Sequence, residues 1–126
     1  EISIDAGTKE TYEKVRRNGD WDILMKNLEY INTIKTLENV KLSFVIQDDN
    51  YKEMELFENL KHKLNNIPRV RTHYYKLLDW GVMKNYEEKA VWKSTHKNFT
   101  EFKSIWKDFE KTINPENTTH NLLGVI

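Results

Sequence analysis

Polar side chains suited to binding a small ligand lie at the carboxyl end of each of three strand-like runs in this chain. The three groups are Ser3 with Asp5, then Gln47, Asp48 and Asn50, and finally Asp79 with Trp80. Ligands of parallel α/β proteins bind beyond the carboxyl ends of the strands, so we expect these groups to share one rim, to which Arg16 returns on the following helix. Carboxylates and amides bind hydroxyls, and a guanidinium binds a carboxylate. The pattern predicts a rim for a small zwitterionic or ribose-bearing ligand, unless the Asp and Asn residues only cap the next helices.

The sequence lacks the residues that several other kinds of active site need. The four histidines do not have metal-ligand spacing, and the four glycines form no phosphate-binding loop. The adjacent pairs Asp48–Asp49 and Glu87–Glu88 are typical of solvated side chains rather than of acid–base catalysis. Cysteine is absent, which excludes thiolate catalysis and a cysteine-ligated iron–sulfur cluster within the chain. We therefore predict no catalytic residue and no metal ligand.

Hydrophobic periodicity predicts strands that alternate with helices. Strands are expected over 1–5, 40–47 and 69–78, with helices after Thr8, after Asp20, over 50–66 and over 95–113. Alternation of this kind gives right-handed crossovers and a parallel sheet. The predicted fold is α/β, a partial (half) TIM-like barrel with three parallel strands alternating with helices.

A half barrel of three strands leaves both sheet edges open, whereas parallel sheets are normally extended and covered. We expect the other half to come from a missing upstream segment, since Glu1 already lies in a strand-like run, or from a second copy in a homodimer. A single domain is predicted over 1–126. Within it, 1–81 form the strand and helix core, and 82–126 form a loop, an amphipathic helix and an apolar tail.

The charge balance narrows the range of partners. Twenty Lys and Arg residues match twenty Asp and Glu residues, so the formal net charge is zero, which argues against a nucleic-acid partner. Neither a run of about 18 apolar residues nor a basic and apolar leader is present, so we expect no membrane partner and a cytoplasmic location.

Four motifs resemble the radical S-adenosylmethionine (radical SAM) superfamily, especially members with SPASM or twitch extensions. Residues 1–20 read EISIDAGTKETYEKVRRNGD and are similar to the family's fourth-strand region. Residues 43–50, SFVIQDDN, resemble the fifth strand, and residues 78–81, LDWG, resemble the end of the sixth. Ser94-Thr95-His96 resembles a Ser-His-Pro helix start, although Lys97 stands in place of the proline. The chain thus resembles the C-terminal half of the family's core barrel.

The resemblance implies S-adenosylmethionine (SAM) as cofactor and a peptide or small molecule as substrate. It implies that Ser3 and Arg16 contact the amino-acid end of SAM, that Asp5 shapes the same rim, and that Gln47 or Asn50 lies near the ribose or adenine; Asp79 and Trp80 are placed on the substrate rim. The chain departs from the family in lacking the CxxxCxxC loop, so a 4Fe-4S cluster requires a missing N-terminal segment and the chain alone is expected to be inactive. The alternative is a non-catalytic binding or assembly module, a degenerate half-barrel that self-associates.

Overall fold

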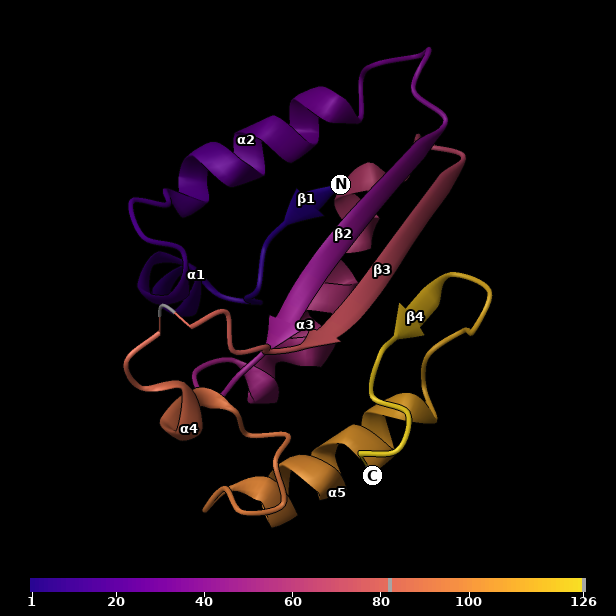
Figure 1. Ribbon diagram of the computed structural model, residues 1–126. Helices are drawn as coiled ribbons and strands as arrows, with labels where there is room; N and C mark the ends of the chain where they lie inside the picture. Colours follow the sequence, from indigo (N-terminus) through magenta and orange to yellow (C-terminus); the bar gives the residue numbers. More distant parts are fainter. Residues whose placement is uncertain (82, 126) are drawn as a thin grey trace.

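The strands of the described residues all run parallel in one sheet (Figure 1). The computed structural model describes residues 1–81 and 83–125. The strands are β1 (Ile2–Ser3), β2 (Asn39–Ile46), β3 (Arg69–Lys76) and β4 (Thr118–His120), and the helices are α1 (Lys9–Val15), α2 (Trp21–Ile31), α3 (Met54–Glu58), α4 (Tyr86–Lys89) and α5 (Phe99–Glu110). Two 3₁₀ segments, η1 (Tyr51–Glu53) and η2 (Asn59–Leu64), flank α3. The predicted α/β class with a parallel sheet is confirmed.

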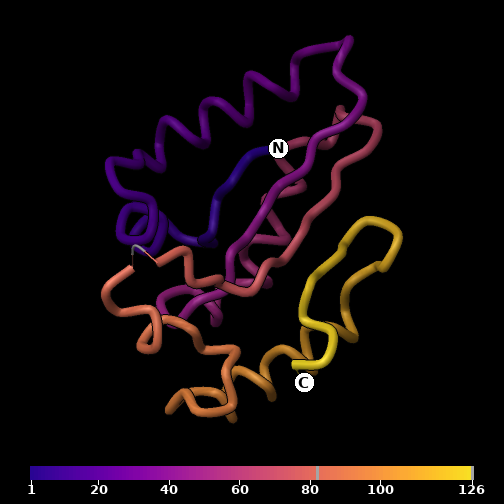
Figure 2. The backbone as a smooth tube through the Cα atoms, in the orientation of Figure 1, coloured from indigo at the N-terminus to yellow at the C-terminus, as the bar shows by residue number. Residues whose placement is uncertain are grey.

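The sheet has four strands in the described ranges, not the three predicted, in the order β1-β2-β3-β4. The added strand lies within 82–126, where only a loop, a helix and an apolar tail were expected. β4 pairs with β3 from Thr72↔Thr118 to Tyr74↔His120. It has three polar residues, too few for a visible alternation, so periodicity alone could not reveal it. Figure 2 traces the C-terminal segment from α5 through β4 and back towards α5.

Sequential strand order explains where the helices lie. When each right-handed crossover adds its strand on the same side of the last one, the crossover helices pack on one face of the sheet. Val40, Leu42, Phe44 and Ile46 of β2 point to that face and form one buried core with side chains of α2, α3, η2 and α5. Figure 1 shows α3 behind β2 and β3.

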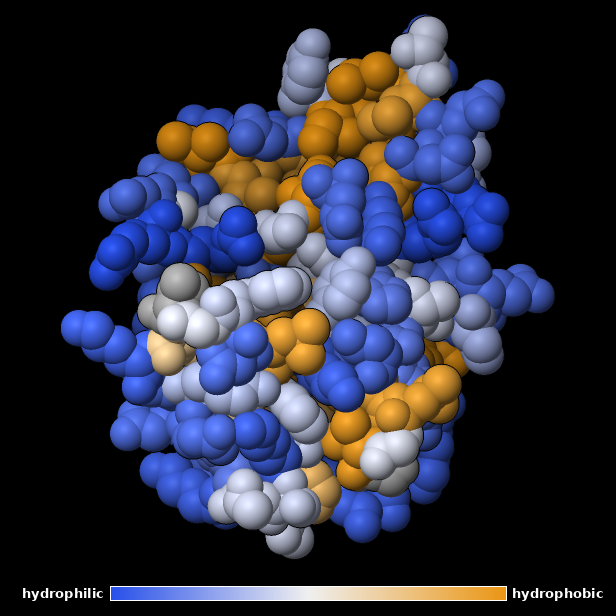
Figure 3. All heavy atoms as spheres, viewed as in Figure 1, coloured by the Kyte–Doolittle hydropathy of each residue, from blue (hydrophilic) through white to orange (hydrophobic). Residues whose placement is uncertain are grey.

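The opposite face of the sheet is largely polar. Lys41, Ser43, His73 and Tyr75 alternate with the core residues of β2 and β3 and therefore point away from the main core. Hydrophilic side chains predominate over these strands in Figure 3. At the carboxyl end of this face, Val45 packs against a small apolar cluster formed by Leu77, Tyr86 and Ala90.

The helices predicted after Thr8 and Asp20 begin as expected, whereas those predicted over 50–66 and 95–113 differ from the structure. Within 50–66 only α3 is α-helical, and the 3₁₀ segments η1 and η2 flank it. The Thr8 and Asp20 side chains accept hydrogen bonds from the backbone N–H groups of Thr11 and Ile23, as N-caps do. The helix predicted over 95–113 is shorter: α5 begins at Phe99, because residues 95–98 form turns around His96. In the parts of the chain that the structure describes, no helix is long and apolar enough to cross a bilayer.

Candidate functional site

Asp5 is a buried junction at the carboxyl end of β1. Its backbone has φ of 61°, in the left-handed region that non-glycine residues other than Asn and Asp rarely adopt. One carboxylate oxygen accepts from the Val45 N–H at 2.8 Å, and the other accepts from Arg16 Nη1 at 2.8 Å. Burial raises the pKa of the Asp5 carboxyl, and these two donors only partly oppose the rise. Asp5 therefore joins β1, β2 and α1 rather than presenting a free carboxylate.

Asn50 is a second buried junction, 1% exposed, in the turn after β2. Its amide nitrogen donates to the backbone oxygens of Asp5 at 2.9 Å and of Val45 at 2.8 Å. Its side-chain oxygen accepts from the Gln47 N–H at 2.9 Å. With both donors and the acceptor engaged by backbone, the amide holds the ends of β1 and β2 together and has little capacity left for a ligand.

The Glu53 side chain holds the loop between β1 and α1 in place. Its carboxylate accepts from the backbone N–H groups of Gly7 at 2.8 Å and Thr8 at 3.0 Å, and from the Thr11 hydroxyl at 2.6 Å. This approach requires glycine at position 7, because a Cβ there would lie 2.5 Å from Leu56 Cβ. The rim is thus built on a preorganised backbone.

Three of the predicted rim residues keep polar atoms available. The Arg16 side chain is 41% exposed and uses Nη1 for Asp5, which leaves its other donors towards solvent. Ser3 is exposed and its hydroxyl accepts from the Ser43 hydroxyl at 3.2 Å. Gln47 is half-buried, and within residues 1–81 and 83–125 its side chain has no hydrogen-bond partner. Ser3, Arg16 and Gln47 are therefore the predicted residues best placed to meet a ligand.

Asp79 and Trp80 lie in the exposed segment that follows β3. Asp79 accepts from the Gly81 N–H at 2.8 Å, which closes a local turn, and Trp80 is 77% exposed. No hydrogen bond or ion pair connects either side chain to Asp5, Arg16 or Asn50 in the described part of the chain. The two groups of predicted residues thus come from neighbouring strand ends but share no contact.

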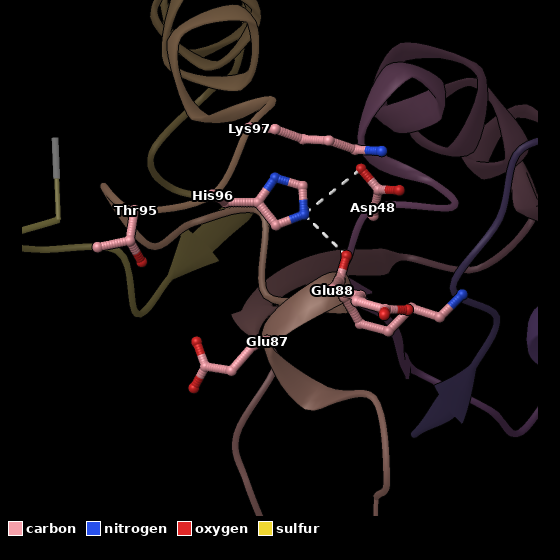
Figure 4. Close-up of a pocket in the computed structure, with 7 residues that line it drawn as sticks. Asp48, Glu87, Glu88, Thr95, His96 and Lys97 are labelled. Carbon is pink, nitrogen blue, oxygen red and sulfur yellow. Dashed lines mark hydrogen bonds and ion pairs between the residues drawn. The ribbon is translucent and has the colours of Figure 1, made fainter.

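A pocket of about 550 Å³ opens at the carboxyl end of β2 (Figure 4). Its lining consists of Asp48, Glu87, Glu88, Lys89, Thr95, His96 and Lys97, and we call it the rim pocket. Figure 4 shows one ring nitrogen of His96 facing both Asp48 and the backbone oxygen of Glu88. His96 Nε2 lies 2.8 Å from that oxygen and 3.7 Å from the Asp48 carboxylate.

The hydrogen bonds of His96 define its neutral tautomer. Nδ1 accepts from the Asn98 N–H at 3.0 Å, so Nε2 carries the proton and donates to the Glu88 carbonyl. The Asn98 amide also donates to Asp48 at 2.8 Å. The contact between His96 and Asp48 was not predicted from the sequence, because the two residues lie far apart in the chain. The only signal was the helix-start pattern at Ser94-Thr95-His96.

A partly buried ion-pair cluster supports the wall of the rim pocket. Asp49 pairs with Lys14 at 2.9 Å and also with Lys89. Burial alone would raise the pKa of the Asp49 carboxyl, but the two ammonium groups hold it below its usual value. The Asp48 N–H donates to the Lys89 carbonyl at 2.9 Å, so α4 is fastened to the end of β2. Asp49 is thereby assigned to structure.

Known proteins provide no further guide to the site. Among the described residues, no group of three His, Cys, Asp or Glu side chains is arranged to hold a metal ion. Comparison of the chain with protein-family models, with curated proteins and with solved structures gives no match.

Proposed function

We propose that this chain forms the C-terminal half of a radical SAM-type barrel and supplies part of the rim that binds SAM. The whole protein would modify a peptide or small molecule, and this chain would be inactive alone. The observation that carries the proposal is the one-sided parallel sheet. Its strands follow in sequential order, its main helices pack on one face, and its other face is polar.

A barrel accounts for the polar face better than an open, doubly wound sheet does. In a doubly wound sheet, helices cover both faces and the strands are apolar on both sides. In a (β/α) barrel, all helices lie outside and the other sheet face becomes the interior. Lys41, Ser43, His73 and Tyr75 would line that interior, below the rim formed by Ser3, Arg16 and Gln47.

The rim residues fit the polar parts of SAM. The exposed guanidinium of Arg16 suits a carboxylate, and the Ser3 hydroxyl and Gln47 amide suit an amino group or ribose hydroxyls. Asp5 and Asn50 would act indirectly, since both hold the backbone that carries these groups. SAM, when bound, would supply the reactive 5′-deoxyadenosyl group, while this chain binds and orients it.

The residues do not fit an iron–sulfur cluster. Such clusters are held by cysteine thiolates, and the chain has no cysteine. The cluster ligands in this proposal belong to an N-terminal half-barrel. Since half of a TIM-like barrel would precede this chain, a CxxxCxxC motif is expected within about a hundred residues upstream in the coding sequence. Its absence there would overturn the proposal.

Calorimetric titration of SAM into the full natural polypeptide tests the rim directly. Arg16→Ala is expected to weaken SAM binding by about tenfold or more, because one charge-assisted hydrogen bond to SAM would be lost. Arg17→Ala is the matched control, because Arg17 is exposed and adjacent. Gln47→Ala is a second variant, since no intramolecular hydrogen bond of the side chain is lost. Equal SAM affinity in all variants would contradict the assigned rim.

The uncovered sheet face also favours a second candidate function, self-association. A degenerate half-barrel could pair with a second copy through this face and the free edge of β1. Light scattering combined with intact mass separates the two ideas. A natural polypeptide of this length that forms a stable dimer and does not bind SAM would favour the assembly module.

A further inference from the structure

A second pocket, of about 450 Å³, is lined by two lysines and by no carboxylate in the described chain. Its lining consists of Lys76, Trp92, Lys93, Ser94, Thr95, Leu123, Gly124 and Val125, and we call it the lysine pocket. It is formed by the end of β3, the segment after α4 and the segment after β4. The rim pocket differs in containing three carboxylates beside its two lysines.

Lys76 contributes a cation that has no anionic partner among the described residues. Its Nζ lies 4.9 Å from the ring centroid of Trp92, and no ion pair of this group occurs in the ranges that the structure describes. The indole is fixed because its Nε1 donates to the Leu77 carbonyl at 2.8 Å. A π face orients an ammonium group without neutralising it. Lys76 is therefore positioned with its donors still available for an anion.

Lys93 contributes a second cation, which pairs with a solvent-exposed carboxylate. Its Nζ is 4.6 Å from the Tyr86 ring centroid and 5.9 Å from that of Trp92. It pairs with Glu87 at 2.7 Å, but the Glu87 side chain is 72% exposed. Exposed ion pairs contribute little to stability, so a ligand anion can share this ammonium group at low cost.

Apolar and hydroxyl groups complete the pocket. Leu123 is 86% exposed and, with Val125, forms an apolar wall next to the exposed Ser94 and Thr95. Figure 3 shows hydrophobic surface gathered at the C-terminal segment. The wall is anchored, because the Asn121 side chain accepts from the Lys76 N–H at 2.7 Å.

We propose that the lysine pocket binds the carboxylate of an amphiphilic ligand. Two ammonium groups and two hydroxyls match one carboxylate, and the wall of Leu123 and Val125 accepts an adjoining apolar side chain. An acyl amino acid and the carboxyl terminus of a peptide ending in an apolar residue share this chemistry. The proposal is independent of SAM binding, because Ser3, Arg16 and Gln47 do not line this pocket.

Nuclear magnetic resonance titration of the full chain tests this site through the Trp92 indole N–H, assigned with Trp92→Phe. The probes are N-acetyl-leucine, its neutral amide N-acetyl-leucinamide, inorganic phosphate, and a pentapeptide with a free C-terminal leucine. N-acetyl-leucine is expected to shift the Trp92 signal saturably, and the amide is not. Tighter binding of the pentapeptide assigns the ligand to a peptide, and equal binding assigns it to a free acid. Equal shifts from the acid and its amide, or stronger binding of phosphate, would overturn the proposal.

Lysine variants locate the binding to this pocket. Lys76→Met is expected to weaken N-acetyl-leucine binding by about tenfold, equivalent to about 1.4 kcal/mol, while Lys76→Arg stays within roughly threefold of the natural chain. Lys93→Met repeats the test on the second ammonium group if Lys76→Met fails to fold. Lys26→Met in α2 is the matched control, because it removes one exposed charge elsewhere. Equal losses in the control and pocket variants would refute the assignment.

Discussion

Replacing Asn50 by alanine is expected to destabilise the fold rather than simply remove a ligand contact. The side chain makes three hydrogen bonds, to the carbonyls of Asp5 and Val45 and from the N–H of Gln47. At about 1 kcal/mol for each hydrogen bond, the loss is about 3 kcal/mol, and more if the three backbone groups stay dry. Domains of this size are stable by about 5–15 kcal/mol, so the variant should remain mostly folded in water.

Asn50→Asp distinguishes the bridging amide from a simple loss of volume. The new carboxylate would place an oxygen against the carbonyls of Asp5 and Val45, where the amide donates. Its pKa in the folded state would rise, because burial and two facing carbonyls favour the neutral form. The folded protein then binds more protons than the unfolded chain, so the variant should lose stability as the pH rises from about 4 to 7. Asn50→Ala should show no such added dependence.

Urea unfolding followed by circular dichroism measures both effects. Asn27→Ala is the control, because Asn27 is an exposed asparagine of α2 and its loss should change the free energy of unfolding by less than about 0.5 kcal/mol. An Asn50→Ala variant as stable as the control would refute the structural role and return Asn50 to the ligand-binding residues.

Two further substitutions test the backbone and the ion pairs around the rim. Gly7→Ala would bring a Cβ to 2.5 Å from Leu56 Cβ, so the free energy of unfolding is expected to fall by about 1–3 kcal/mol. Urea titration measures this change, and an unchanged unfolding midpoint would contradict the close packing. Asp49→Asn breaks the pairs with Lys14 and Lys89. The pKa of Asp49 in the folded state lies below its usual 3.8, so the natural chain should be more stable than the variant at pH 7. This difference in stability should disappear as the pH falls below about 4. A difference that does not change with pH would refute the role of the ion pairs.

The sequence was sufficient to predict the elements that have long periodic patterns. The stripe of α5 buries Phe102, Trp106 and Phe109 as its spacing predicts, and the caps at Thr8 and Asp20 form. Long amphipathic helices and local caps depend on neighbours within a few residues, so single-sequence patterns report them well.

The sequence could not predict features that depend on tertiary contacts. Asn50 after a strand suits a helix cap or a ligand contact, and the choice of a bridge to Asp5 depends on residues 45 positions apart. The contact between His96 and Asp48 has the same origin. β4 exists because β3 offers a free edge, which three polar residues do not reveal by themselves.

The polar sheet face links the fold to the proposed SAM-binding role and to the alternative of self-association. A parallel sheet that is covered on one side only must either meet another layer or be stable with polar groups towards solvent. The face is already internally paired in part: Lys41 donates to the Tyr75 hydroxyl at 3.2 Å, and Ser43 donates to Ser3 at 3.2 Å. These long, partly buried hydrogen bonds could exchange for contacts with a ligand or a second half-barrel. An apolar face would instead have required a permanent cover, so the polar residues allow this face either to be exposed to solvent or to meet a second layer.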